Sequence, residues 1–171
     1  MDFFEFVSTR RSIRTFTDRR VDDEQLHKIL EAANLAPSAG NLQAYEIYVV
    51  REPSLRTSLA EAAHSQSFVS EAPLVLVFCA HPARSAQRYK QRGERLYAIQ
   101  DATIACTFAM LAATDLGLGT VWVGAFDEES MRQAIGAPPG VNPVALLPIG
   151  YAAEKPEAAA RRPLHELVHI R

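Results

Sequence analysis

The chain has 171 residues, of which 48% are hydrophobic and 22% charged, and its formal net charge is -2. This length can bury the core of one soluble domain, which we expect to span residues 1–171, and the near-neutral charge provides no electrostatic footprint for nucleic acid or an anionic membrane. Cys79 and Cys106 both lie in apolar runs, as buried thiols do. The N-terminal sequence MDFFEFVSTRR lacks the order of a signal peptide, so we expect a cytoplasmic protein.

The first predicted helix begins after Asp2, which can form a capping box with Glu5. It leads into a basic segment that contains three arginines and a serine: Arg10, Arg11, Ser12 and Arg14. Guanidinium groups with a hydroxyl between them suit a phosphate, because each guanidinium donates hydrogen bonds in pairs and stays charged. A solvated basic patch is the competing interpretation of this cluster.

A second helix is predicted from Val21, with acidic residues in its first turn and apolar residues at helical spacing up to Ala33. It stops before Pro37, where a polar loop over residues 37–43 precedes the strand pattern of residues 45–50. The hydroxyl and amide groups of this loop can donate hydrogen bonds to a ring carbonyl or ring nitrogen of a ligand. Taken alone, the loop is an ordinary turn.

Further along, a polar helix over residues 55–63 precedes a buried strand over residues 74–79. The next strong signal is a helix from about Tyr97 to Leu116, which has no charged residue between Asp101 and Asp115. A helix that is apolar nearly all round is a buried core helix, and the uncharged run is shorter than the ~20 residues of a bilayer span.

Glycines at 117 and 119 end this helix, and a β-prone run over residues 120–123 follows. Gly124 and Ala125 then allow two interpretations. The ordinary one is a turn glycine after a core strand, which this stretch alone favours. The functional one is a pair of exposed backbone N–H groups that face a planar ligand. A helix starting at Asp127 and a buried strand over residues 144–149 complete the predicted elements.

Five segments occur in order with suitable separations: RRSIRTF, APSAGNLQ, GLGTVWVGAF, LPIGYAAEKP and RRPLHELVHI. Together they resemble the FMN-dependent nitroreductase family, of which this chain looks like a short member, from about Phe3 to Ile170. The resemblance implies an α+β fold, in which a central, mostly antiparallel sheet is surrounded by helices. It also implies an intertwined homodimer with FMN at the interface, so that each site takes residues from both chains.

The resemblance also implies roles for individual residues. The FMN phosphate and ribityl chain are expected at Arg10, Arg11, Ser12 and Arg14. The flavin ring is expected to meet the partner's loop at Pro37, Ser38, Ala39, Asn41 and Gln43, and its own chain at Trp122, Gly124 and Ala125. Either Arg161 or Arg162 is expected to complete the phosphate site, and Arg162, directly before Pro163, is preferred.

The expected activity is ping-pong electron transfer. NAD(P)H delivers hydride to flavin N5, and a nitroaromatic, quinone or similar electron-poor acceptor then takes the electrons, with no catalytic side chain required. The cations between residues 81 and 95 either attract the NAD(P)H phosphates or form a solvated helical face. The alternatives are a flavin-binding or flavin-storage protein, or a family activity such as dehalogenation, flavin fragmentation or heterocycle dehydrogenation. No metal site is expected, because His165 and His169 have no third ligand type nearby.

Overall fold

The computed structural model describes residues 2–171. The helices are α1 (Phe3–Thr9), α2 (Asp23–Asn34), α3 (Pro53–Ala62), α4 (Phe68–Glu71), α5 (Pro82–Arg92), α6 (Ala98–Asp115), α7 (Glu128–Ala134) and α8 (Leu164–Leu167). Two shorter turns are the 3-10 turn η1 (Ala39–Asn41) and the π-helical turn η2 (Gly93–Tyr97). The strands are β1 (Tyr45–Val50), β2 (Leu74–Ala80), β3 (Gly119–Thr120) and β4 (Asn142–Gly150).

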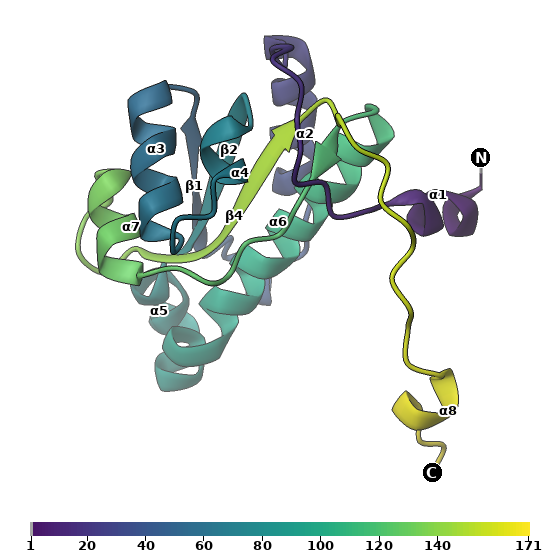
Figure 1. The fold of residues 1–171 in the computed structure, drawn as a ribbon. Helices are drawn as coiled ribbons and strands as arrows, with labels where there is room; N and C mark the ends of the chain where they lie inside the picture. Colours follow the sequence, from purple (N-terminus) through teal and green to yellow (C-terminus); the bar gives the residue numbers. More distant parts are fainter. Residues whose placement is uncertain (1) are drawn as a thin grey trace.

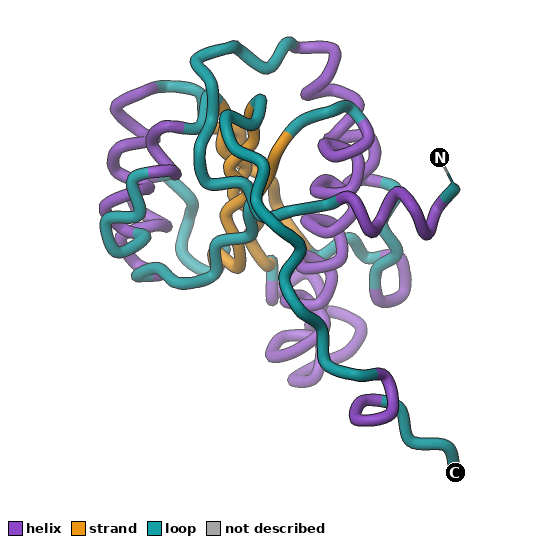
Figure 2. The backbone as a smooth tube through the Cα atoms, turned by 45° about the vertical axis from the view of Figure 1, so that its right-hand side comes forward, coloured by secondary structure: helices purple, strands orange, loops and turns teal. Residues whose placement is uncertain are grey.

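The four strands form one sheet in the order β1-β2-β4-β3, and every neighbouring pair is antiparallel. Strand β2 is buried along its whole length, because helices cover both faces of the sheet (Figure 2). Its side chains alternate between these faces, as the pleat of a strand requires. Leu74, Leu76 and Phe78 belong to the core beside α2 and α6, whereas Val75 and Val77 belong to the core beside α3 and α7.

Helix α6 crosses the sheet diagonally between α2 and the strands (Figure 1). Its buried side consists mainly of alanines: Ala98, Ala102, Ala105, Ala109 and Ala113, with Asp101 and Cys106. Small side chains let the helix approach the strands closely, which confirms the predicted core helix on this side. The opposite side differs from the expectation of burial all round, because Ile99 is 44% and Phe108 37% exposed in the single chain.

By length and composition alone, the helical run from Pro82 to Asp115, which is kinked at Lys90, could also cross a membrane. Its packing against the sheet and the buried carboxylate of Asp101 are those of a core helix in a globular domain.

Capping residues and glycines in the sequence correctly predicted where several helices begin and end. Asp2 and Glu5 form the predicted capping box, and Asp22 and Gln25 form a second one at the start of α2. After α6, Gly117 has φ +74°, the left-handed conformation expected of a helix-ending glycine. The strand that follows is shorter than the predicted run over residues 120–123. Strand β3 covers only Gly119 and Thr120.

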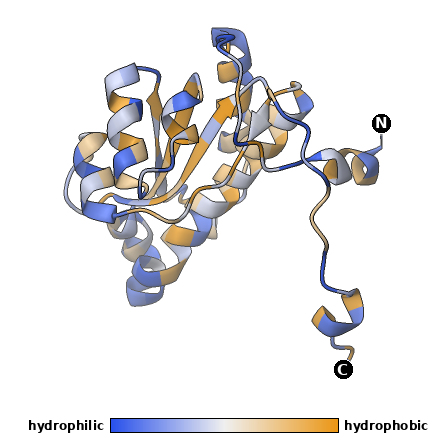
Figure 3. Cartoon of the chain, viewed as in Figure 1, coloured by the Kyte–Doolittle hydropathy of each residue, from blue (hydrophilic) through white to orange (hydrophobic). Residues whose placement is uncertain are grey.

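Two arms leave the layered body: α1 at the N-terminus, and the segment that leads from residue 153 to α8 (Figure 1). Both arms contain hydrophobic residues among hydrophilic ones (Figure 3). Some of these are exposed, among them Phe4, which is 80% exposed, and Ile170, which is 93% exposed.

Candidate functional site

The basic segment after α1 is held against the sheet as an extended strand. Ser12 forms a parallel bridge with Thr120, and the Ile13 N–H donates to the Thr120 carbonyl at 2.9 Å. Ile13 is buried over Gly119, where a Cβ would lie 2.8 Å from its Cγ1. The absence of a side chain at Gly119 therefore lets the basic segment approach β3. Burial of Ile13 turns the neighbouring polar side chains toward the other face.

The same segment is fixed on its other side by the chain that follows β4. Phe16 forms an antiparallel bridge with Ala152, and the Ala153 N–H donates to the Thr15 carbonyl at 2.9 Å. The Glu154 carboxylate accepts from the backbone N–H groups of Arg14 and Thr15. These contacts bring the start of the C-terminal arm beside the basic segment, although the two are far apart in the sequence.

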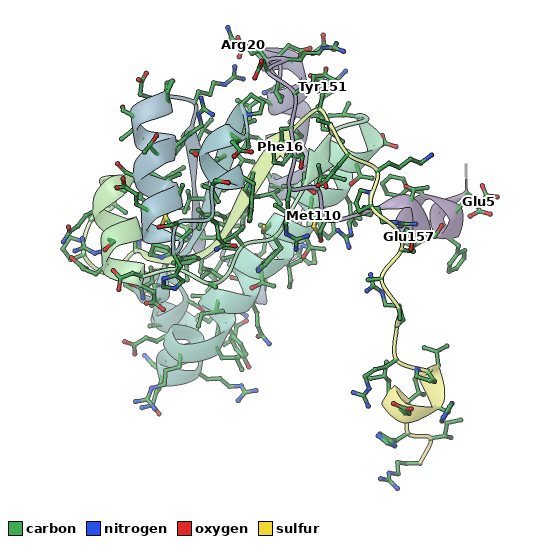
Figure 4. The ribbon with its side chains drawn as sticks, viewed as in Figure 1. Glu5, Phe16, Arg20, Met110, Tyr151 and Glu157 are labelled. Atoms are coloured by element: carbon green, nitrogen blue, oxygen red, sulfur yellow. The ribbon has the colours of Figure 1, made fainter. Side chains whose placement is uncertain are left out.

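Between these segments lies a cavity of about 450 Å³, which we call the basic cavity. Its polar lining includes Arg10, Arg11, Ser12, Arg14 and Arg161, and the remaining walls come from α1 and from residues 156–159. Glu157 supplies a carboxylate to this lining, and Figure 4 shows Glu157 on the C-terminal arm close to α1. The structure thus brings together all four residues predicted for the phosphate site in the N-terminal motif.

The electrostatics of the basic cavity favour an anion. The pKa of Arg10 is lowered by partial burial and by the positive charges of Arg161 and Arg11. Among residues 2–171, none of the four arginines of the cavity forms an ion pair with a carboxylate. Arg11 is oriented by its own backbone, since its Nη1 donates to the carbonyls of Ser8 and Arg10, the latter at 2.9 Å. A dianion would relieve the repulsion between these cations.

The surroundings of Arg161 and Arg162 differ, and they favour Arg161 where the sequence favoured Arg162. Arg161 lines the basic cavity, whereas Arg162 donates to the Glu166 carbonyl at 3.1 Å and lies 3.4 Å from its carboxylate. The two residues are neighbours in an extended arm, so their side chains leave the backbone in different directions. Arg161 is therefore our candidate for the phosphate contact, which stays a prediction.

The polar loop over residues 37–43 is tightly folded. Gly40, Asn41 and Gln43 have φ values of +56°, +55° and +48°, which is uncommon for the two residues that carry side chains. The Ser38 Oγ accepts from the Gln43 N–H at 2.9 Å. The side-chain amide of Gln43 donates to Asn34 Oδ1 at 2.9 Å. In the single chain this amide is therefore engaged within its own subunit, and Ser38 keeps its hydroxyl proton free to donate outward.

Sequence reasoning missed Asp101, which anchors this loop. Its carboxylate accepts from the Ala39 N–H at 2.9 Å and from the Ala44 N–H at 3.3 Å. The available signal was a charged residue at the start of an otherwise apolar helix. This signal does not identify the partner of Asp101, because a contact across 62 residues of sequence leaves no local pattern.

The third predicted group follows β3. Trp122 is half-buried and packs against the core beside α2 and α6, whereas Gly124 and Ala125 are exposed. Gly124 does not have a left-handed backbone. A tight turn therefore does not explain why glycine stands at this position. The nearest atom to a Cβ at this position would be Trp122 Nε1, at 3.3 Å. A hydrogen bond holds the chain at Ala125, because the Gln66 Nε2 donates to the Ala125 carbonyl at 3.2 Å.

The three predicted groups border three different cavities in the single chain. The loop residues Pro37, Ser38 and Ala39 border a mainly apolar cavity of about 470 Å³ with side chains of η2 and α6. Gly124 borders a third cavity, of about 450 Å³, together with Arg95, Ile99 and Phe126. An assembly in which the loop serves the partner's site remains a prediction, and it is the arrangement in which these groups would converge.

The cations between residues 81 and 95 divide into two sets. Arg84 donates to the Leu42 carbonyl, and the Arg92 Nε donates to the Tyr97 hydroxyl at 2.9 Å. Arg88 lies 5.4 Å from the centre of the Tyr89 ring. Arg84 thus contacts the loop and Arg92 the helical turn η2, whereas Arg95 borders the Gly124 cavity. Among residues 2–171 no cluster of ligands suits a metal, and both cysteines are buried and free.

Comparison with known proteins agrees with this architecture. The family description "Nitroreductase family" matches residues 7–85 and 62–151. The chain therefore belongs to the nitroreductase family. An NADH dehydrogenase of Thermus thermophilus is 36% identical over 186 residues, which cover 93% of this chain and 91% of that protein. An FMN reductase [NAD(P)H] of Bacillus subtilis is 31% identical over 176 residues, or 95% and 71% of the two chains.

Among solved structures, the NADPH:FMN oxidoreductase from Vibrio harveyi complexed with NAD+ superposes with a TM-score of 0.90 at 30% identity. The match covers 98% of this chain and 76% of that chain. The α+β fold expected from the sequence, with an antiparallel sheet between helices, is thus confirmed.

Proposed function

We propose that this protein is an NAD(P)H-dependent FMN oxidoreductase that reduces nitroaromatics, quinones or similar electron-poor acceptors. The observation that carries the proposal is the basic cavity, where four arginines and a serine converge and no arginine forms an ion pair with a carboxylate in the described part of the chain. The relatives named FMN reductase and NADPH:FMN oxidoreductase support the choice of cofactor and reductant.

The residues of the cavity fit the phosphate end of FMN. A phosphate offers three acceptor oxygens and close to two negative charges, which match several guanidinium groups better than one carboxylate would. In this proposal Arg10, Arg11, Arg14 and Arg161 neutralise the phosphate, and Ser12 donates a hydrogen bond to it. A flavin held here would supply hydride uptake from NAD(P)H and reduction of the acceptor.

The other residues orient the ring and exclude water from it. Trp122 supports the chain that presents the backbone at Gly124 and Ala125. The loop with Pro37, Ser38, Ala39, Asn41 and Gln43 acts on the partner's flavin, with Gln43 contributing through its backbone, because its side chain binds Asn34. Neither cysteine serves as a nucleophile, since burial raises the pKa of Cys79 to about 12 and also raises that of Cys106.

A homodimer is part of the proposal. The exposed apolar side of α6 and the two hydrophobic arms offer surfaces that a second copy of the chain would cover. Helix α6 and the loop anchored to it by Asp101 would then lie at the same interface. We place the enzyme in the cytoplasm, in keeping with the dinucleotide reductant.

The test begins with the purified protein. We expect flavin absorbance bands that survive desalting, with FMN released on denaturation, and steady-state oxidation of NADH or NADPH with a quinone well above the rate of free FMN. Riboflavin in place of FMN serves as the control for the phosphate contact. Bound FMN with turnover no faster than free FMN would favour the flavin-storage alternative, and absence of flavin binding would refute the proposal.

A further inference from the structure

The most constrained polar group outside the basic cavity is the carboxylate of Asp101. The residue lies in the first turn of α6 and is 2% exposed. A buried carboxylate is costly unless hydrogen bonds satisfy it. Here both oxygens accept backbone N–H groups, from Ala39 at 2.9 Å and from Ala44 at 3.3 Å. Asp101 therefore fixes the connection between α2 and β1 at two points, in its middle at Ala39 and at its end at Ala44.

The loop needs this support because of its backbone. Asn41 and Gln43 both have left-handed φ values, which residues with a Cβ rarely adopt without outside constraint. Within the loop, the Gln43 N–H is satisfied by the Ser38 Oγ at 2.9 Å. This bond uses the hydroxyl oxygen as an acceptor and leaves its proton available to a ligand. Ser38 borders the apolar cavity next to Asp101 itself.

We propose that Asp101 is a positioning residue that shapes the loop of one subunit for the flavin ring in the other subunit. The inference rests on the proposed function, and it assigns a role to a residue that contacts neither the phosphate nor the reacting atoms. Asp101 acts through the backbone at Ala39 and Ala44, and through them it orients the Ser38 hydroxyl.

The first test compares Asp101→Asn with Asp115→Asn, an exposed aspartate at the other end of the same helix. Asparagine keeps the size but replaces one acceptor oxygen with an NH₂ group, so one loop N–H loses its acceptor. If the loop then adopts its binding-competent shape in only about one molecule in ten, the apparent affinity falls about tenfold. We expect Asp101→Asn to weaken FMN and riboflavin by the same factor of about ten, because the loop meets the ring, while Asp115→Asn binds both like the wild type.

The second test separates positioning from a general loss of structure. Mixed dimers are purified with two tags, one chain carrying Asp101→Asn and the other carrying Arg14→Ala with Arg161→Ala. If the loop acts on the partner's flavin, the Asp101→Asn chain contributes an intact phosphate site that meets an intact loop. We expect one site per mixed dimer to bind FMN with wild-type affinity.

Mixed dimers in which no site binds FMN with wild-type affinity would overturn the proposal. The Asp101→Asn change would then impair the flavin site of its own chain and not that of the partner. Wild-type affinity of Asp101→Asn for both flavins would overturn it as well. If Asp101→Asn does not fold, Ser38→Ala is expected to show the same equal loss of FMN and riboflavin, and unchanged binding by that variant would count as refutation. Failure of the wild type to bind flavin would instead refute the proposed function, so the two failures are distinguishable.

Discussion

Replacing Arg161 by glutamine, with Arg162→Gln as the matched control, tests the placement of the phosphate. The two residues are adjacent and chemically identical, but Arg161 lines the basic cavity while Arg162 is engaged with Glu166. Loss of one hydrogen bond to a charged group costs about 1.5–3 kcal/mol. This corresponds to roughly 10- to 100-fold weaker FMN binding by Arg161→Gln. Arg162→Gln should change FMN affinity by less than about twofold, as expected when no contact to the ligand is lost.

Replacing Arg161 should weaken FMN binding but should not lower the stability of the flavin-free protein. The positive charge of Arg161 lowers the pKa of Arg10, so the two cations repel each other when the cavity holds no anion. Removing Arg161 relieves this repulsion, and the flavin-free variant should be at least as stable as the flavin-free wild type. A variant that binds FMN weakly and is also less stable would point to damage of the arm rather than loss of a phosphate contact.

The assay is a fluorescence titration with FMN and with riboflavin, at low and at moderate salt. Because only FMN carries the dianion, riboflavin affinity should be the same in the wild type and in both variants. Salt should weaken FMN binding less in Arg161→Gln than in the wild type, since one charge fewer is screened. Equal loss of both ligands in Arg161→Gln, or a larger loss in Arg162→Gln, would refute the assignment.

Three further outcomes are expected. Gly124→Val should leave the free energy of unfolding within about 0.5 kcal/mol of wild type, because its backbone is not left-handed and one indole nitrogen is the near neighbour, at 3.3 Å. In stopped-flow experiments its bound flavin should be reduced by NADH up to ~100-fold more slowly, and a wild-type rate would contradict the ring contact. Gly119→Ala should cost about 1–3 kcal/mol in urea unfolding and weaken FMN, because the new Cβ would press on Ile13; an unchanged midpoint would show that the basic segment is not held there. Cys79 and Cys106 should not react with an aromatic disulfide reagent at pH 8 until the protein is unfolded, because burial raises the pKa of both thiols and blocks access to them. Fast labelling of the folded protein would exclude this packing.

The prediction of a homodimer is checked by sedimentation velocity. A second copy of the chain would bury the apolar side of α6 and the hydrophobic arms, whose exposure is otherwise unfavourable. We expect a single species of twice the chain mass at micromolar concentration, with or without flavin. A flavin-saturated monomer would contradict both the dimer and the role of the loop in the partner's site.

Local interactions explain what the sequence determined by itself. Capping at Asp2 and Asp22, the apolar runs of the buried strands and the helix-ending glycine at 117 depend on neighbours within a few residues. These signals were sufficient to place most of the helices and the three long strands. The order of five segments, from RRSIRTF near the N-terminus to RRPLHELVHI at the C-terminus, was sufficient to indicate the family.

Contacts between segments far apart in the sequence determine the details of the candidate site and the orientation of α6. The path of the C-terminal arm places Arg161, and not Arg162, at the basic cavity, and no local pattern distinguishes the two residues. The engagement of Gln43 with Asn34 and the anchoring of the loop by Asp101 depend on α2, α6 and the loop meeting in space. Only the packing of the sheet against α6 shows which side of that helix is buried, because a helix that is apolar nearly all round carries no periodicity to mark its buried face.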